Sequence, residues 1–496
     1  MKKLYMGNEL IAYGALKAGV GLVCGYPGTP STEVLETVAR LKAKGIARDV
    51  YVEWSVNEKS AMEVAAGAAY AGTRCMVTMK QVGLNVASDP LMSLEYVGVK
   101  GGLVVLVADD PGPISSQTEQ DTRKFGEFSK VPVFDPSSPE EAYEMMEDAF
   151  LLSEKYNTPV FMRPVTRICH ATAAFSVPES FSAKKAEGFI KDSKRWVIFP
   201  RTSYLNHQRI EKRNQELRGE LSDYRFNTIE GSGNKGIAAS SVSVAYAKEA
   251  LSLLGADCKF FKIATPFPFP EKKAIEFLEG LDEVMVYEEL DPVIERELTY
   301  IIGKYNLNVK IRGKLTGDTP IAGENSTENA LDVFAQFLGI EKLPQMAAVD
   351  APLPIRPPTL CAGCPHRASF YAVKQAMKGR KAVFAGDIGC YTLGNAMPLD
   401  MTDTCLCMGA GITIAQGIKR SEEDTVCFSF TGDSTFFHTG LAGITNAVYN
   451  NTDIVAVILD NSTTAMTGHQ PNPSTGFSAV GEVAAKIDIL SVGKIA

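Results

Sequence analysis

The chain has 496 residues, and at about 150 residues per domain this length predicts roughly three domains. Its 50 basic and 58 acidic residues give a net charge of −8, which argues against nucleic acid or an anionic membrane surface as the main partner. No apolar run reaches about 18 residues, so we expect no transmembrane helix. Ten cysteines are too few for a disulfide scaffold, and we therefore expect a cytoplasmic protein with free thiols.

The first block, residues 1–178, alternates short apolar runs with helical patterns. We interpret as strands Val20–Cys24, Val50–Trp54, Cys75–Met79 and Leu103–Ala108, and as helices Ser31–Lys44 and Glu58–Gly72. Apolar runs without polar alternation are typical of parallel strands covered on both faces. The alternation of strands and helices predicts a doubly wound α/β domain.

The second block, residues 179–343, begins with a polar stretch and then alternates again. Its predicted elements are Gly236–Ala239, Ala245–Leu254, Cys258–Ile263 and Glu283–Tyr287. They indicate a smaller α/β domain, in which we find no chemical motif. Five prolines between 344 and 358 disfavour a helix or a central strand, so this segment is predicted to be a linker between domains.

The third block, residues 359–496, shows the same alternation. The predicted strands are Ala382–Ala385, Thr425–Phe430 and Asp453–Asp460, and the predicted helices lie near Gly409–Ile418 and Thr439–Tyr449. A loop, Asn461–Gly476, and one further helix follow. Nothing before Ala496 resembles the end of a domain, so we expect this domain to be truncated. The fold class predicted for the whole chain is α/β, with three doubly wound parallel-sheet domains.

Two polar clusters of the third block follow predicted strands. Thr431–Ser434 comes after one strand, and Asp460–Thr463 comes after the next. Ligands bind at the carboxyl edge of open α/β sheets, where Gly432 would allow close approach of the backbone. A carboxylate from Asp433, the amide oxygen of Asn461 and a backbone carbonyl at Thr463 suit Mg²⁺, which takes its remaining oxygens from phosphates. An ordinary β–α turn would explain either cluster alone. The pairing of the two clusters is a more specific sign of a site for Mg²⁺ and a diphosphate.

The spacing of these clusters resembles that of thiamine diphosphate enzymes. Their signature is Gly-Asp-Gly followed, after a helix and a strand, by Asn; here Gly432-Asp433-Ser434 is followed 28 positions after the aspartate by Asn461. Ser434 departs from the family's glycine, which matters little for metal binding because the ligand is the aspartate. The resemblance implies Mg²⁺ ligation by Asp433, Asn461 and Thr463, and a thiamine diphosphate site that also includes Gly432 and Ser434.

The first block carries matching features. Glu58 stands between a predicted strand and a predicted helix, where a glutamate can simply favour a helix N-terminus. However, Gly25–Thr32 resembles the Tyr-Pro-x-Thr-Pro segment of 2-oxoacid:ferredoxin oxidoreductases. That resemblance implies that Thr29 contacts the substrate carboxylate and that Glu58 supplies the catalytic carboxylate to the aminopyrimidine ring. Lys80–Asn85 lies where the same family places an active-site loop.

The whole chain resembles the family of indolepyruvate ferredoxin oxidoreductase alpha subunits. The segments that carry this resemblance are Cys361–Arg367, Gly386–Cys390, Cys407–Gly411 and Gly432–His438. It implies an aminopyrimidine-binding domain, a transketolase C-terminal-like domain and a diphosphate-binding domain, in that order. It also implies aryl-pyruvate substrates, coenzyme A, ferredoxin and a smaller beta subunit in a hetero-oligomer. The cofactor should lie across the first and third domains, from one chain or two.

The cysteines leave several interpretations open. Cys361-x-x-Cys364 is compatible with zinc, a redox dithiol or an iron–sulfur cluster. In related oxidoreductases the positions of Cys361, Cys364 and Cys390 ligate a [4Fe–4S] cluster, but the family's fourth ligand is missing, since no cysteine follows Cys427. A structural role beside the cofactor is therefore the favoured interpretation. The family's C-terminal ferredoxin-like module is also missing before Ala496, which indicates a fragment or an electron module on another polypeptide.

Two other functions compete with the oxidoreductase. A non-oxidative 2-oxoacid decarboxylase would use the same thiamine residues without clusters or coenzyme A, and its CO₂ release would need no electron acceptor. A non-catalytic scaffold subunit would not bind thiamine diphosphate at all. The presence of Glu58, Asp433 and Asn461 argues against the scaffold.

Overall fold

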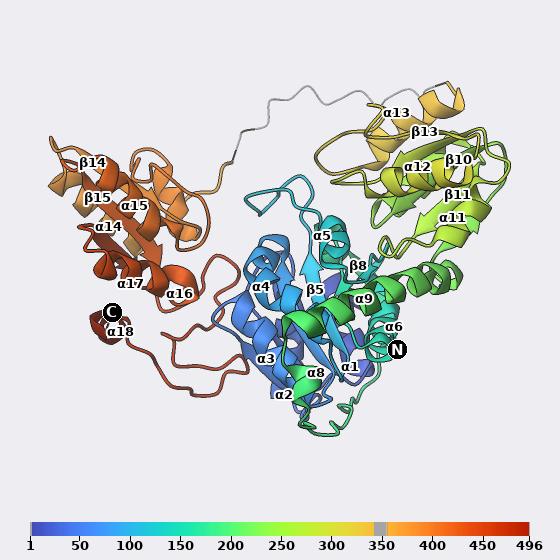
Figure 1. The fold of residues 1–496 in the computed structure, drawn as a ribbon. Helices are drawn as coiled ribbons and strands as arrows, with labels where there is room; N and C mark the ends of the chain where they lie inside the picture. Colours follow the sequence, from blue (N-terminus) through green and yellow to red (C-terminus); the bar gives the residue numbers. More distant parts are fainter. Residues whose placement is uncertain (1, 342–353, 355, 496) are drawn as a thin grey trace. The chain divides into compact units, whose positions relative to one another are not determined.

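The structure is a computed structural model that describes residues 2–341, 354 and 356–495, and it divides into two compact units, Met1–Met346 and Ala347–Ala496 (Figure 1). Most of the predicted linker, 344–358, lies outside the described residues. The predicted domain boundaries stay predictions. In the ranges that are described, no helix has both the length and the apolar character needed to cross a membrane.

The first half of unit 1 is built from strands and helices in alternation. They are β1 (Lys3–Met6), α1 (Gly7–Lys17), β2 (Leu22–Gly25), α2 (Thr32–Ala43), β3 (Tyr51–Trp54), α3 (Glu58–Tyr70), β4 (Cys75–Lys80), α4 (Gln81–Val97), β5 (Leu103–Ala108), α5 (Thr122–Ser129), β6 (Val133–Phe134), α6 (Pro139–Tyr156), β7 (Val160–Met162), α7 (Thr166–His170) and β8 (Thr172–Phe175). Strand β5 has the predicted bounds, and the other three predicted strands shift by at most two residues at either end.

Six of these strands form one parallel sheet in the order β3-β2-β4-β5-β7-β6. All six side chains of the central strand β5 are buried, as expected for a strand covered on both faces. Helices α3 and α4 lie on one side of the sheet and α1 and α6 on the other (Figure 1). The remaining two strands, β1 and β8, form a separate antiparallel pair that the apolar pattern did not predict.

The second half of unit 1 begins with two helices, α8 (Ser193–Trp196) and α9 (Pro200–Glu220), and a 3₁₀ turn, Leu221–Asp223. The long helix α9 is unexpected from its polar sequence, and its buried face includes Arg213 and Asn214. The guanidinium of Arg213 forms a 2.6 Å ion pair with the buried carboxylate of Glu95 on α4. Ile210 and Leu217 complete this buried face, so an ion pair supplements an apolar stripe that is too sparse to indicate a packed helix.

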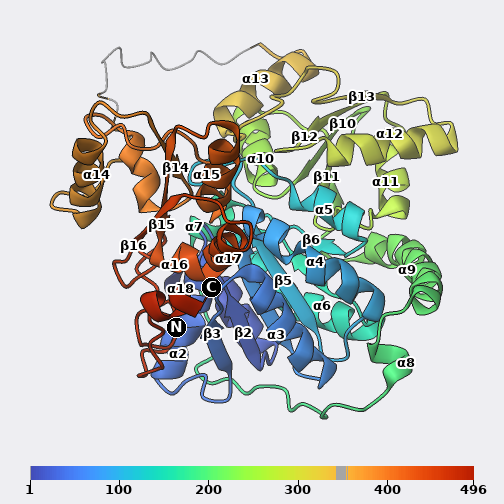
Figure 2. The same ribbon diagram turned by 60° about the vertical axis from the view of Figure 1, so that its left-hand side comes forward.

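A second sheet completes unit 1. Its elements are β9 (Thr228–Glu230), β10 (Lys235–Ser240), α10 (Ser243–Leu254), β11 (Lys259–Ile263), α11 (Glu271–Leu278), β12 (Glu283–Tyr287), α12 (Val293–Tyr305), β13 (Lys310–Arg312) and α13 (Thr327–Leu338). The strand order is β13-β12-β10-β11-β9. Only β9 is antiparallel to its neighbour, so this sheet differs from the purely parallel sheet that the sequence predicted. Helices α11 and α12 cover one face and α10 and α13 the other (Figure 2).

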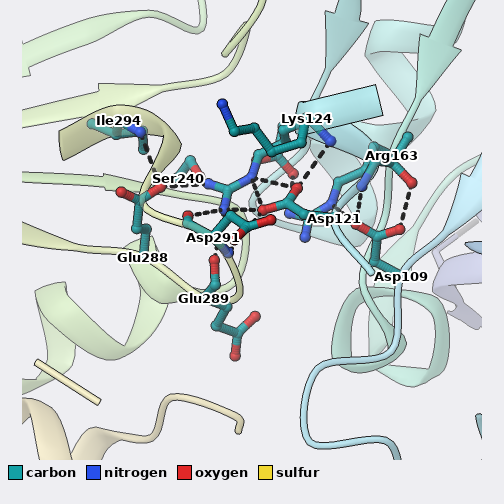
Figure 3. A network of polar contacts seen from close by, with 12 residues as sticks. Asp109, Asp121, Lys124, Arg163, Ser240, Glu288, Glu289, Asp291 and Ile294 are labelled. Carbon is teal, nitrogen blue, oxygen red and sulfur yellow. Dashed lines mark hydrogen bonds and ion pairs between the residues drawn. The ribbon is translucent and has the colours of Figure 1, made fainter. Parts of the chain in front are cut away.

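A buried ion network joins the two sheets of unit 1 (Figure 3). Arg123, at the start of α5, pairs with Asp121 at 2.6 Å and with Glu288, just after β12, at 2.8 Å. The same guanidinium donates to the carbonyls of Glu289 and Asp291. Because each of the paired side chains is at most 1% exposed, these charges are compensated by one another rather than by water.

Unit 2 contains a smaller sheet. Its elements are α14 (Pro365–Ala376), β14 (Ala382–Gly386), a 3₁₀ turn (Cys390–Asn395), α15 (Ala410–Ser421), β15 (Val426–Gly432), α16 (Asp433–Thr435), a π-helical turn (Phe436–Gly440), α17 (Leu441–Tyr449), β16 (Val455–Leu459) and α18 (Ile489–Ile495). The three strands are parallel in the order β14-β15-β16. Helix α14 packs on one face and α15 on the other, which confirms the predicted α/β class.

Candidate active site

The three strands of unit 2 end at one edge of their sheet, and an acidic residue follows each of them. Asp387 comes after β14, Asp433 after β15 and Asp460 after β16. Paired residues such as Gly386 with Phe430, and Gly432 with Leu459, show that the carboxyl ends are adjacent. This is the edge at which open α/β sheets bind ligands.

Asp433, Asn461 and Thr463, the predicted Mg²⁺ ligands, lie close together in the structure. The backbone N–H of Thr463 donates to Oδ2 of Asp433 at 3.1 Å and to Oδ1 of Asn461 at 3.3 Å. Side chains of the following loop also donate to Oδ2 of Asp433, from Asn472 and Ser474, each at 3.1 Å. Burial raises the pKa of Asp433, and the hydrogen bonds from Asn472 and Ser474 oppose that rise.

The oxygen atoms of this site fit Mg²⁺. The carboxylate oxygen of Asp433 and the amide oxygen of Asn461 face the same backbone N–H, and oxygens of these kinds are the hard ligands that Mg²⁺ prefers. Among the described residues, no three His, Cys, Asp or Glu side chains gather as a metal site. Nearby hydroxyls suit phosphate oxygens: Oγ1 of Thr464 donates to Oγ of Ser434 at 2.9 Å.

Gly432 makes a close contact that the sequence motif did not predict. A Cβ at this position would lie 2.6 Å from Cε1 of Tyr391, so the glycine makes room for the ring of Tyr391. The hydroxyl of Tyr391 donates to the carboxylate of Asp387, which also accepts a 2.9 Å hydrogen bond from Thr431. Burial raises the pKa of Asp387 to about 7 against these hydrogen bonds. Sequence reasoning missed this pair, although Asp387, like Asp433, directly follows a strand.

Cys361, Cys364 and Cys390, the candidate ligands of an iron–sulfur cluster, lie close enough for their charges to interact. Burial raises the pKa of the Cys390 thiol, and the charges of Cys361 and Cys364 raise it further. All ten cysteines are free thiols, and Cys361 is exposed. The neighbouring His366 is buried, which lowers its pKa, whereas the charge of Asp433 opposes this shift. The thiols therefore belong to the surroundings of the Asp433 edge, and cluster ligation by them stays a prediction.

Unit 1 places Glu58 at the carboxyl edge of its six-stranded sheet. Glu58 begins α3, and Asn57 caps that helix by accepting a 2.8 Å hydrogen bond from the Ser60 amide. The Glu58 side chain is 5% exposed. It lies against α4, because a Cβ on Gly83 would be only 2.5 Å from Oε1 of Glu58. Gly83 thus leaves the space in which the carboxylate sits.

Thr29 lies at the same edge, between β2 and α2. Its carbonyl accepts a 3.4 Å hydrogen bond from the hydroxyl of Ser115, and the ammonium of Lys80 donates to the Ser115 carbonyl at 3.1 Å. A Cβ on the adjacent Gly28 would lie 3.0 Å from Cγ of Lys80. Burial lowers the pKa of Lys80, and the charges of Asp110 and Glu58 oppose that shift. Lys80, the first residue of the predicted active-site loop, is therefore a cation of this edge.

The predicted active-site loop Lys80–Asn85 has a different structure. Lys80 ends β4 and Gln81 begins α4, so the strand passes directly into a helix. The structure thus gathers the predicted site residues in two sets. The first contains Glu58 and Thr29, at the carboxyl edge of the six-stranded sheet in unit 1. The second contains Asp433, Ser434, Asn461 and Thr463 in unit 2.

Two family models match the chain. Residues 13–195 match the pyruvate flavodoxin/ferredoxin oxidoreductase, thiamine diphosphate-binding model, and residues 387–495 match the C-terminal thiamine pyrophosphate-binding domain of thiamine pyrophosphate enzymes. The first match contains Thr29 and Glu58, and the second contains Asp433 and Asn461. A solved structure, 2-oxoglutarate:ferredoxin oxidoreductase from Magnetococcus marinus, shares the fold at 18% identity and a TM-score of 0.52, covering 68% of this chain and 65% of that one.

Curated relatives cover nearly the whole chain. The indolepyruvate oxidoreductase subunit IorA of Thermococcus kodakarensis is 42% identical over 99% of this chain and 79% of its own length. The subunit of the same name from Methanothermobacter thermautotrophicus is 40% identical over 98% of this chain and 79% of its own length. The chain therefore belongs to the family of indolepyruvate oxidoreductase IorA subunits, which are thiamine diphosphate-dependent oxidoreductases of 2-oxoacids.

Proposed function

We propose that this chain is the thiamine diphosphate- and Mg²⁺-binding subunit of an enzyme that oxidatively decarboxylates aryl-pyruvates such as indolepyruvate. The products would be the aryl-acetyl-coenzyme A and CO₂, and ferredoxin would take the electrons. The observation that carries this proposal is the convergence of Asp433 and Asn461 on the Thr463 amide. The substrate class rests on the name of relatives that are about 40% identical.

The residues of the chain then have distinct tasks. Asp433, Asn461 and the carbonyl of Thr463 would hold Mg²⁺ and, through it, the diphosphate. Thiamine diphosphate, when bound, supplies the electron sink for the carbanion that the departing CO₂ leaves. Glu58, buried at the start of α3, would hold a proton at the aminopyrimidine nitrogen. Thr29, just before the N-terminus of α2, would bind the substrate carboxylate.

The partners in this proposal are a smaller beta subunit, ferredoxin and coenzyme A. Relatives named as a subunit support a hetero-oligomer. We expect [4Fe–4S] clusters to carry the electrons. In this chain, the candidate cluster ligands are Cys361, Cys364 and Cys390. The four cysteines of unit 1 are buried free thiols, which supports a reducing, cytoplasmic location.

The first test is thiamine diphosphate binding by calorimetry in the presence of Mg²⁺. Asp433→Ala should abolish binding, whereas Asp424→Ala, an exposed aspartate before β15, should leave it unchanged. The wild-type chain with its partner subunit should reduce ferredoxin only when indolepyruvate and coenzyme A are both present. CO₂ release without an electron acceptor would instead indicate a decarboxylase. Wild-type protein that binds no thiamine diphosphate would favour a scaffold.

A further inference from the structure

Asp387 and Tyr391 have no task in the proposed chemistry, yet both contact the turn that carries Asp433. Their segment leaves β14 at the edge where β15 ends, and the two strands are hydrogen-bonded neighbours. Groups that hold a metal ligand without touching the metal set that ligand's orientation. Both Asp387 and Tyr391 reach residues next to Asp433 in the chain.

Asp387 ties the ends of two strands together through a carboxylate that is fully buried. One oxygen accepts a 2.9 Å hydrogen bond from the hydroxyl of Thr431, and the other accepts from the hydroxyl of Tyr391. Since Thr431 lies two residues before Asp433, the Asp387 carboxylate fixes the chain on the amino side of the proposed metal ligand.

Tyr391 fixes the same turn by packing and by a second hydrogen bond. Its ring lies against the backbone of Gly432, where a Cβ would come within 2.6 Å of Cε1, and against Gly389, where a Cβ would lie 2.7 Å from Cζ. Its hydroxyl is 2.9 Å from Oγ1 of Thr435. Gly432 and Thr435 flank Asp433, so one buried tyrosine holds the chain on both sides of the ligand.

We propose that Tyr391 and Asp387 are positioning residues that orient the carboxylate of Asp433 for Mg²⁺. This inference rests on the proposed function, in which Asp433 is the metal ligand. Because a metal site needs its ligands held to within a fraction of an ångström, a small shift of Gly432 or Thr435 weakens Mg²⁺ binding without unfolding the sheet. Excess Mg²⁺ then restores binding, since the ligands themselves are still present.

The test uses the full chain and thiamine diphosphate calorimetry over a series of Mg²⁺ concentrations. Tyr391→Phe removes only the hydroxyl and keeps the ring on Gly432. Tyr371→Phe is the matched control, because Tyr371 lies on α14 in the same unit and is 60% exposed. We expect Tyr391→Phe to raise the Mg²⁺ concentration for half-maximal binding by about 10- to 100-fold, as is typical of the groups that support metal ligands. Saturating Mg²⁺ should restore wild-type binding, and Tyr371→Phe should change nothing.

A second variant crowds the same contact from the side of Gly432. Gly432→Ala places a methyl group against the Tyr391 ring, and it should also raise the Mg²⁺ requirement in a way that excess Mg²⁺ corrects. An unchanged Mg²⁺ requirement in Tyr391→Phe, or lost binding that excess Mg²⁺ does not restore, would overturn the positioning role. If Asp433→Ala also leaves the Mg²⁺ requirement unchanged, the metal site itself fails. If Asp433→Ala abolishes Mg²⁺-dependent binding while Tyr391→Phe does not alter it, only the positioning role fails.

Discussion

Replacing Arg123 with methionine should destabilise unit 1 strongly, because this guanidinium holds the two sheets together. The change keeps a side chain of similar length but removes the ion pairs with Asp121 and Glu288 and the hydrogen bonds to two carbonyls. Asp121 and Glu288 are each at most 1% exposed, so water cannot compensate the charges left behind. Breaking a buried pair from one side costs about 3–5 kcal/mol, and we expect a loss of about 4 kcal/mol here.

The assay is urea unfolding followed by tryptophan fluorescence. The two tryptophans of the chain, Trp54 and Trp196, both belong to unit 1, so their fluorescence reports this unit. With a slope of about 3 kcal/mol per molar urea, the midpoint should fall by about 1 M. The control is Arg225→Met, which removes a guanidinium that pairs with Asp148 and is 55% exposed, and which should cost less than about 1 kcal/mol.

A double variant separates the charge effect from the packing effect. Adding Glu288→Gln to Arg123→Met removes one of the uncompensated carboxylates, so part of the lost stability should return. A midpoint for Arg123→Met that falls no further than that of Arg225→Met would refute this reasoning. It would mean that the junction between the two sheets depends on apolar packing rather than on the ion network.

Three other predictions use single changes. Burial raises the pKa of Glu289 from 4.5 to about 7, so the folded state loses stability as the pH rises across this range. The neutral side chain of Glu289→Gln should therefore add about 3 kcal/mol to the free energy of unfolding at pH 8 and nothing at pH 4, in the same urea assay. Gly83→Ala puts a methyl group 2.5 Å from Oε1 of Glu58 and should lower thiamine-dependent turnover at least about tenfold, while Gly67→Ala, with no atom within 4 Å, should not. Cys361 should react with a thiol reagent in the native protein, whereas the buried thiols of unit 1 should react only after unfolding, as mass spectrometry of the labelled peptides would show.

The sequence predicted the parallel sheets well where strands are apolar on both faces. Leu103–Ala108 is such a run, and the structure has a strand with these bounds. Helix α9 escaped prediction because Arg213 and Asn214 make up half of its buried face, beside Ile210 and Leu217. The arginine pairs with Glu95, more than a hundred residues away in the chain. A periodicity argument counts apolar residues, so it gives only a weak signal for a helix whose buried face is half polar.

The candidate site was predictable only where its residues follow a fixed spacing. Asp433 and Asn461 lie one strand–helix–strand unit apart, and the fold brings such residues to one edge. Asp387 is at the same edge, but its spacing from Asp433 includes a long irregular segment, so no short pattern links the two. The contact between Gly432 and the Tyr391 ring is a matter of shape, and a sequence shows only that a glycine is present.

The second sheet explains why its part of the sequence carries no chemical motif. Ser240 ends β10 and Glu288 follows β12, so polar side chains stand at the carboxyl edge of this sheet as they do in the other two. Here the partner at that edge is Arg123, which donates to the carboxylate of Glu288 and to the hydroxyl of Ser240. Parallel strands thus direct polar groups to the carboxyl edge of each of the three sheets, and at this edge those groups join the two large sheets of unit 1.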